Sequence, residues 1–315
     1  MRTRTIVRRL VALLPMLLLV ALMIFGITYL VPGDAAATIA GEGASEADIA
    51  RIRHELGLDR SFFAQFTSWL GDLLHGDLGT SLTSGRSVGD LIRSRAPASL
   101  SIGIAGMVVG IVIGTSLGVM AGTKIRSARD RAAVVAASVG VAMPNFWLGL
   151  LLVTVFAVNL GWLPSSGYVG LTEDPVDFLR HLILPALALG CATAAEICRQ
   201  TRASLANTLE LDYVRTARMK GLPRRQVVGK HAFKNAASPV VTTIGLQATV
   251  ILGGTVIVER VFGIAGLGTS AIEAVAARDI PVIQGIVLVT TLLAIVINLG
   301  VDLVQMYLNP KVRVA

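Results

Sequence analysis

Long apolar windows separated by polar segments dominate the chain. A transmembrane helix needs roughly 20 mostly apolar residues, and six windows of about that length recur along the sequence. The fourth window is the weakest, because Glu196 interrupts it near one end. The predicted spans are Val11–Val31, Ala96–Thr123, Ala132 to about Leu160, Leu182 to about Cys198, Ala236–Val258 and Ile280 to about Leu308.

The first apolar window has features that could be confused with a secretory signal. Arg8 and Arg9 precede it, and three alanines, Ala35–Ala37, follow it. The apolar core of a signal peptide is only about 7 to 15 residues long, and this window is longer. We therefore interpret it as a retained membrane span.

Composition and charge agree with a membrane protein and predict its orientation. The chain is 54% hydrophobic and 15% charged, with a mean hydropathy of +0.71, which excludes a water-soluble domain. With the N-terminus inside, the segments at the cytoplasmic face carry 19 of the 28 Lys and Arg residues. The positive-inside rule then places both termini in the cytoplasm. The net charge of +8 thus reports topology and contact with membrane lipid, and gives no reason to predict nucleic-acid binding.

The cysteines and histidines predict neither a redox site nor a metal site. Cys191 and Cys198 lie seven residues apart in the fourth window and would share one helix face. In an apolar span, cysteine behaves as a small packing residue. The four histidines show no metal-ligand spacing. We predict no metal site and no catalytic residue in this chain.

A short amphipathic helix is predicted in the long segment between the first two spans. Ser45 is followed three residues later by Asp48, an acidic variant of the capping box. Ile49, Ile52 and Leu56 then recur at helical spacing, and Gly57 provides a stop. Such a helix could lie on the membrane surface or help to receive a partner protein.

Five glycines recur at an unbroken four-residue spacing in the second span. A row of this kind removes the side chains from one helix ridge, so that a second helix can approach backbone to backbone. The sequence therefore predicts a helix-packing interface. It is formed by Gly106, Gly110, Gly114, Gly118 and Gly122.

Ionisable residues are almost absent from the predicted spans. A charge in hydrocarbon costs at least about 2.5 kcal/mol, and such residues usually mark an ion or proton pathway. Glu196 and Asp302 lie near the cytoplasmic ends of their spans, where water or the nearby Arg199 can satisfy them. The pattern does not favour an ion-coupled carrier, which holds a charged relay or broken helices near the midplane.

The segment between the fourth and fifth spans, residues 211–235, is strongly basic. We call it the elbow. It contains seven Lys and Arg residues. Gly221 is suited to ending one helix and Pro223 to beginning the next, so a helix, a turn and a second helix are predicted. On physical grounds the elbow could contact anionic lipid or dock into a partner. The first helix presents a face of small residues edged by an aromatic ring and a positive charge: Tyr213, Thr216, Ala217 and Lys220.

Several ordered motifs resemble one family of membrane proteins over nearly the whole chain. One motif consists of Arg215, Thr216 and Ala217, followed after three further residues by Gly221. It resembles the EAA signature of ATP-binding-cassette (ABC) importer permeases. The remaining motifs are similar to those of the dipeptide, oligopeptide and nickel importer permeases, in the first-permease subunit. They are "LGLDRSFFAQF", "HGDLGTSL", "MPNFWLGLLL", "LGWLPSSGY", "DYVRTARMKGL", "KHAFKNAASPVVTTIGLQ", "ILGGTVIVERVFGIAGLG", "RDIPVIQGIV" and "NLGVDLVQMYLNPKVR".

The chain departs from the family pattern at a few positions. Arg215 stands where the signature has its glutamate, and Thr216 replaces the first alanine. Ala265 stands where the family often has proline, and Asn309 replaces a common aspartate. We interpret all four as local variation.

The resemblance implies an all-α membrane protein with the six-helix fold of type I ABC importer permeases. Residues 1–95 would form the first span and a long extracytoplasmic loop. Residues 96–310 would form the shared transmembrane domain, with residues 199–235 as its cytoplasmic coupling loop. The expected location is the inner membrane of a prokaryote.

The resemblance also implies partners and a role for the elbow. Tyr213, Arg215, Thr216, Ala217 and Gly221, with Asp212 and Lys220 beside them, would form a coupling helix and its turn against an ATPase subunit. The chain has no P-loop, so we expect separate ATPases to use ATP and Mg²⁺ while this chain binds no cofactor and is no enzyme. A second, different permease would form a heterodimer with this chain. Two ATPase domains and an extracytoplasmic peptide-binding protein would complete the importer.

Other functions stay open at the level of sequence. Dipeptides, longer peptides, nickel complexes and glutathione-like compounds are all compatible substrates. A stand-alone secondary carrier and a membrane scaffold without transport activity are the alternatives from other classes. The ordered motifs favour a peptide importer.

Overall fold

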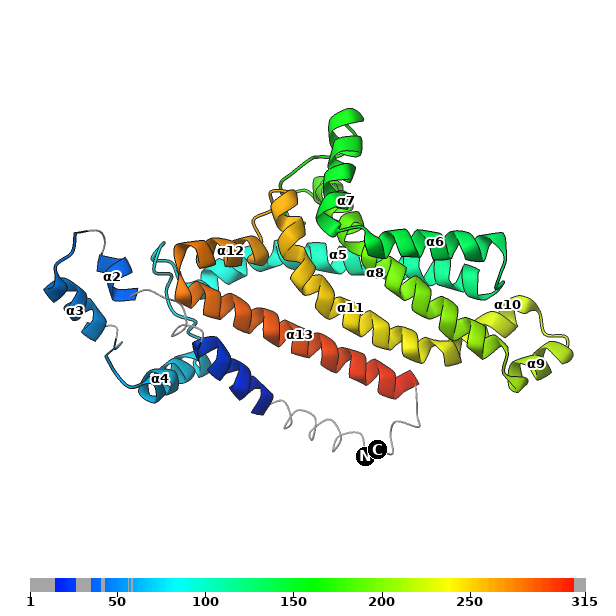
Figure 1. The fold of residues 1–315 in the computed structure, drawn as a ribbon, viewed down its shortest axis with the longest axis horizontal. Coiled ribbons are helices and arrows are strands. Elements are labelled where there is room, and N and C mark those ends of the chain that lie inside the picture. Colours follow the sequence, from blue (N-terminus) through cyan, green and yellow to red (C-terminus); the bar gives the residue numbers. More distant parts are fainter. Residues whose placement is uncertain (1–14, 27–34, 41–42, 56, 58, 309–315) are drawn as a thin grey trace. The chain divides into compact units, whose positions relative to one another are not determined.

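The computed structural model describes residues 15–26, 35–40, 43–55, 57 and 59–308 (Figure 1). The chain divides into two compact units, residues 1–94 with 271–291 and residues 95–270 with 292–315. In the described ranges the regular structure is helical, apart from an isolated β-bridge between Thr80 and Ser87. The helices are Pro15–Gly26, α2 (Ala35–Ala40), α3 (Glu46–Glu55), α4 (Phe62–Leu74), α5 (Val88–Gly122), α6 (Ala128–Ala142), α7 (Asn145–Leu152), η1 (Val153–Asn159), α8 (Pro175–Leu209), α9 (Asp212–Met219), α10 (Arg224–Gln226), η2 (Val227–Phe233), α11 (Lys234–Val261), α12 (Leu267–Ala277) and α13 (Ile280–Leu308).

Four of these helical stretches are long and apolar enough to cross a membrane, and a fifth span results if one bent pair is counted as one. The four correspond to the second, fourth, fifth and sixth predicted spans and contain α5, α8, α11 and α13. The first predicted span, Val11–Val31, extends outside the described residues, within which Pro15–Gly26 is helical. The all-α prediction is therefore confirmed, and the count of spans is compatible with six.

The third predicted span is not one straight helix. The window from Ala132 to Leu160 is divided between α6 and the pair α7 and η1, which meet at a bend of 102°. Pro144 causes the break. The residue before a proline disfavours the helical conformation, and Met143 is accordingly extended, with φ −83° and ψ 122°. The predicted span is thus a bent pair of helices, and the bend was not predicted because hydropathy alone does not detect a helix break.

In the unit that contains α8, this helix packs against α6, α7 and α11 (Figure 1). The glycine row of α5 also lies against it. An ideal Cβ on Gly114 would lie 2.5 Å from the carbonyl oxygen of Ala194, and one on Gly118 would lie 2.8 Å from that of Cys198. On the opposing helix, a Cβ on Gly190 would lie 2.7 Å from the Gly106 carbonyl. Glycine on both helices thus permits direct contact between two backbones.

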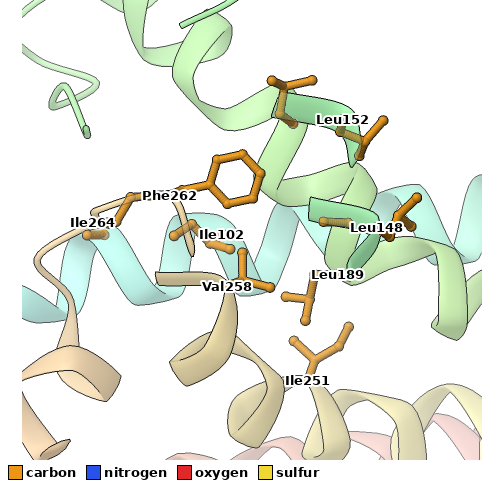
Figure 2. Close-up of a cluster of buried hydrophobic side chains, with 11 residues drawn as sticks. Ile102, Leu148, Leu152, Leu189, Ile251, Val258, Phe262 and Ile264 are labelled. Atoms are coloured by element: carbon orange, nitrogen blue, oxygen red, sulfur yellow. The ribbon is translucent and has the colours of Figure 1, made fainter. Parts of the chain in front are cut away.

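Large apolar side chains fill the core beside this contact. Figure 2 shows Leu189 of α8, Ile102 of α5 and Val258 of α11 directed toward one another. Leu148 and Leu152 of α7 extend the cluster, which also includes residues of the segment that follows α11. Because four helices contribute to one cluster, this core fixes their relative positions within the unit.

Aromatic side chains hold α4 against the helix Pro15–Gly26 in the other unit. The ring of Phe25 lies 5.4 Å from that of Phe62, 5.6 Å from Phe66 and 5.5 Å from Trp69, measured between ring centroids. Clusters with such separations contribute packing energy beyond simple burial. The aromatic contacts thus fix α4 against this helix.

The helix predicted after Ser45 is present as α3. The Ser45 hydroxyl accepts a hydrogen bond from the Asp48 N–H (3.2 Å) and donates one to the Asp48 carboxylate (2.7 Å). Gly57 follows the helix with a left-handed φ of +64°, a conformation that glycine adopts without strain. The capping pattern therefore predicted both the start and the stop of α3.

A buried aspartate anchors the loop that precedes α5. Asp279 lies between α12 and α13 and is only 4% exposed. Its carboxylate accepts hydrogen bonds from the hydroxyls of Ser81 (2.5 Å) and Thr83 (3.0 Å), and from the backbone N–H groups of Leu82 (3.1 Å) and Thr83 (3.3 Å). All of these residues belong to one unit. The anchor therefore joins segments nearly 200 residues apart in sequence.

Candidate functional site: the basic elbow

The elbow is built from two short helices that end and begin where its glycine and proline predict. Helix α9 ends at Met219, and the Gly221 N–H donates to the Arg218 carbonyl (2.9 Å). Gly221 has a φ of +76°, which favours glycine over residues with a side chain. Pro223 then precedes α10 in an extended conformation. The predicted helix, turn and helix are all present.

One side of α9 is turned inward. Val214 and Ala217 form a buried cluster with Val227, against which Leu209 and Leu222 pack. The sequence placed Ala217 on a face available to a partner, and this is wrong. A small apolar residue is suited to close packing on either side of a helix, and here it packs against the chain itself.

The opposite side of α9 is exposed and carries the remaining candidate residues. Tyr213 is 41% exposed and Met219 is 86% exposed. Thr216, Lys220 and the ion pair of Arg215 with Asp212 (3.6 Å) are exposed as well. Sequence reasoning missed Met219, although a methionine at helical spacing from Thr216 was a readable signal. Met219 adds an exposed apolar group to the polar side chains on this side of α9.

Polar contacts and packing connect α9 to the long helices. The Tyr213 hydroxyl donates to the His231 carbonyl (3.2 Å) and accepts from the Asn235 side-chain amide (2.8 Å). Helices α10 and η2 continue without a break into α11. The Ser204 hydroxyl of α8 donates to the Ala236 carbonyl of α11 (2.8 Å). A force applied to α9 would therefore reach both α8 and α11.

An ion pair joins the start of α6 to α8. The Asp130 carboxylate is buried and accepts hydrogen bonds from Nε and Nη2 of Arg202, the latter at 3.0 Å, and from the Arg126 N–H (2.7 Å). Ser127 caps the same helix by accepting from the Asp130 N–H (3.2 Å). The sequence analysis did not identify this pair, because its partners lie 72 residues apart.

We expect Arg202→Met to lower the free energy of unfolding by about 3 kcal/mol, because it leaves a buried carboxylate without its charged partner. The thermal unfolding midpoint of the purified protein measures the loss. The double variant Asp130→Asn with Arg202→Met should recover part of it. As a control, Arg199→Met removes an exposed pair with Glu196 and should cost less than about 1 kcal/mol. Equal losses in the two single Arg variants would contradict this role for Arg202.

A second buried carboxylate, Glu259, lies at the end of α11 and is fully buried. It accepts hydrogen bonds from the Ser99 hydroxyl (2.6 Å) and the Thr269 N–H (2.8 Å), while the Leu267 N–H donates to Ser99 (2.7 Å). These bonds tie the start of α12 to α5 and α11. In the described part of the chain, no group of three or more His, Cys, Asp and Glu residues is arranged to hold a metal ion.

Two segments that together cover most of the sequence match models of one kind of membrane protein. A family model described as the inner membrane component of binding-protein-dependent transport systems matches residues 114–314. The model for the N-terminal part of such membrane components matches residues 2–103. The chain belongs to this family. It is therefore a permease subunit of an ABC importer, in which separate subunits hydrolyse ATP.

Relatives and solved structures of ABC permeases agree with this assignment. A peptide transport system permease protein of Brucella melitensis is 39% identical over 313 residues, covering 99% of each chain. The glutathione transport system permease protein GsiC of Salmonella choleraesuis is 42% identical over 308 residues, covering 98% of each chain. The inward-facing MetNI methionine ABC transporter has the same fold, with a TM-score of 0.54 at 18% identity over 70% of this chain and 96% of that chain.

Proposed function

We propose that this chain forms half of the membrane pathway of an importer for peptides and that α9 is its coupling helix. The assignment of α9 as the coupling helix is supported by its division into a packed side and an exposed side. Val214 and Ala217 pack α9 against Val227, which belongs to the helical stretch that continues into α11. Thr216 and Met219 remain exposed on the other side of α9. ATP-driven closure of the ATPases against α9 would be passed to the spans as a rigid-body movement.

The proposed topology places both termini and the elbow in the cytoplasm. The positive-inside rule supports it, since the elbow and the short segment between α5 and α6 are both rich in Lys and Arg. Separate ATPases work on the cytoplasmic side, so an elbow that contacts them must lie there. The Asp279 anchor and the long loop before α5 would then face the extracytoplasmic binding protein.

A second, related permease chain would complete the pathway as a heterodimer. In this chain α5 uses its glycine row for internal packing, while another side of the same helix exposes Ile104, Val108 and Val112. Within a bilayer such a face contacts lipid or another membrane helix. The exposed side of α5 is therefore available to a second permease.

The relatives support a short peptide as the substrate. The permease from Brucella melitensis is named for peptide transport and GsiC is named for glutathione transport. Glutathione is itself a modified tripeptide, so both names describe one substrate class. Glutathione is accordingly the second candidate.

The proposal is tested by isolating the tagged chain with its partners and identifying them by mass spectrometry. In the wild type we expect two ATPases and a second permease to copurify. Thr216→Asp with Met219→Asp adds two charges to the exposed side of α9 and leaves the buried cluster intact. This variant should lose most of the ATPases and keep the second permease.

The control adds two charges at exposed apolar positions on the side of the chain proposed to face outward. Leu171 and Val176 are 57% and 69% exposed, and Leu171→Asp with Val176→Asp should keep the ATPases. Loss of the ATPases from this control, or their retention by the α9 variant, would contradict the proposed coupling helix. A wild-type chain that is isolated alone would contradict the importer assembly.

A further inference from the structure

A pocket of about 360 Å³ lies beneath the elbow. It is lined by residues at the ends of α5 and α8 and by residues of α9, the turn after it, α10 and η2. All of its walls belong to the same compact unit. The pocket thus lies beside both the proposed coupling helix and the ends of two long helices.

Two arginines give the pocket its charge. The Arg224 guanidinium donates to the carbonyl of Thr123 at the end of α5 (2.7 Å), and the Arg218 guanidinium donates to the carbonyl of Leu209 at the end of α8 (3.5 Å). Among the described residues, no carboxylate lies within ion-pair distance of either guanidinium. Each guanidinium has five N–H donors, so several remain available to an anion.

The rest of the wall is apolar. Leu209, Leu222, Val227 and Val228 line the pocket beside the two arginines. Val227 and Val228 open the π-helical segment η2, and π-helical turns inside α-helices occur frequently at functional sites. The pocket lies beside the ends of α5 and α8, on the cytoplasmic side of the proposed topology. Fixed positive charge beside an apolar wall on this side matches a phosphate head group attached to acyl chains.

We infer that the elbow pocket binds a phosphate group, held by Arg218 and Arg224, and that an anionic phospholipid supplies it. Guanidinium groups bind phosphate through paired N–H donors. The inference rests on the proposed topology, which puts the elbow on the cytoplasmic side of the membrane. A bound head group would link α9 to the end of α5 and so stiffen the path from the ATPases to the spans.

The test is native mass spectrometry of the full importer complex, titrated in detergent with phosphatidylglycerol and, separately, with phosphatidylcholine. We expect the wild type to retain phosphatidylglycerol preferentially. Arg218→Gln with Arg224→Gln should weaken its apparent affinity roughly 10-fold or more, because charge-assisted bonds to phosphate are lost. Arg225→Gln with Lys230→Gln removes the same charge at exposed elbow positions that do not line the pocket, and should bind as the wild type does.

Two further measurements test whether the variants damage the fold and whether the phosphate comes from lipid or from solution. Arg218→Lys with Arg224→Lys keeps the charge and should restore part of the affinity. Inorganic phosphate at high concentration should not displace the lipid; displacement without any lipid preference would identify a free-phosphate site and overturn the lipid assignment. Equal lipid and phosphate binding by the wild type and the Arg218→Gln, Arg224→Gln variant would overturn the inference. Because ATPases are counted in the same spectra, failure of the lipid site is distinguishable from failure of the importer assembly.

Discussion

Gly114→Ala is expected to destabilise the permease by about 3 kcal/mol, although it adds a single methyl group to a helix. The new Cβ would lie 2.5 Å from the Ala194 carbonyl oxygen and 2.8 Å from the Ile197 Cβ. Neither atom is at the end of a flexible side chain, so α5 and α8 must separate. Overpacking of a well-packed core typically costs about 1 to 3 kcal/mol, and contact with backbone belongs at the upper end. The unfolding midpoint of the purified protein in detergent measures the effect.

Other glycines in the same chain supply graded controls. A Cβ on Gly253 of α11 would meet no atom within 4 Å, so Gly253→Ala should be neutral or stabilise by up to about 1 kcal/mol through helix propensity. Gly106→Ala should be intermediate, because its Cβ would lie 3.1 Å from atoms of the flexible Leu189 side chain. A Gly114→Ala protein as stable as the Gly253→Ala protein would contradict the close contact of α5 with α8.

The hydropathy pattern predicted the long helices but not where one of them breaks. Apolar windows identify α5, α8, α11 and α13 because lipid requires long apolar helices. The same criterion joined α6, α7 and η1 into one span, since most residues on both sides of Pro144 are apolar. Only the backbone restriction that proline imposes on Met143 distinguishes a bent pair from a straight helix. A reading of prolines beside hydropathy would have found the bend.

The sequence predicted the backbone of the elbow better than its side chains. Gly221 and Pro223 fix where α9 ends and α10 begins through local conformational preferences. Which side of α9 faces inward depends on its packing against Val227, which no local pattern encodes. Ala217 was therefore assigned to the wrong side and Met219 was overlooked.

For the buried carboxylates as well, the local contacts were predictable from sequence and the long-range contacts were not. Asp130 follows Ser127 at the spacing that correctly predicted the Ser45 cap of α3, so its capping bond was readable from sequence. Its bond to Arg202 was not, because the two lie on different helices. Ser81, which bonds Asp279, lies 198 residues away from it, and Ser99, which bonds Glu259, lies 160 residues away. Tertiary contacts between polar residues need the fold before they can be assigned.

Asp279→Ala is expected to release the loop before α5. The change removes one acceptor group that serves the hydroxyls of Ser81 and Thr83 and the N–H groups of Leu82 and Thr83. Hydrogen bonds to a charged group contribute about 1.5 to 3 kcal/mol each. A loss of about 3 kcal/mol in the free energy of loop opening corresponds to roughly 100-fold faster amide exchange at residues 82 and 83. Hydrogen exchange followed by mass spectrometry measures this loss of protection.

The matched control is Asp77→Ala in the same loop. Asp77 is exposed and accepts a single hydrogen bond from the Gly79 N–H (2.8 Å), so its removal should change exchange at residues 82 and 83 little. Equal exchange in the Asp279→Ala protein and the wild type would contradict the anchor. Asp279→Asn should be intermediate, because the amide oxygen still accepts while its NH₂ group meets donors.

The pH dependence of the anchor follows from the same contacts. Burial opposes the charge on Asp279, but the hydrogen bonds from Ser81, Leu82 and Thr83 outweigh it and hold the pKa of this carboxyl below its ordinary value. A carboxyl with a lowered pKa stabilises the fold above the unfolded-state pKa of about 3.9, and this contribution is lost as the pH falls through the folded-state pKa. Loop protection, corrected for intrinsic exchange, should therefore be constant from about pH 8 to pH 5 and fall only below about pH 4. In the Asp279→Asn protein the acid-dependent step should disappear, because the group that titrates is absent. A loop that opens near neutral pH in the wild type would show that another group controls it.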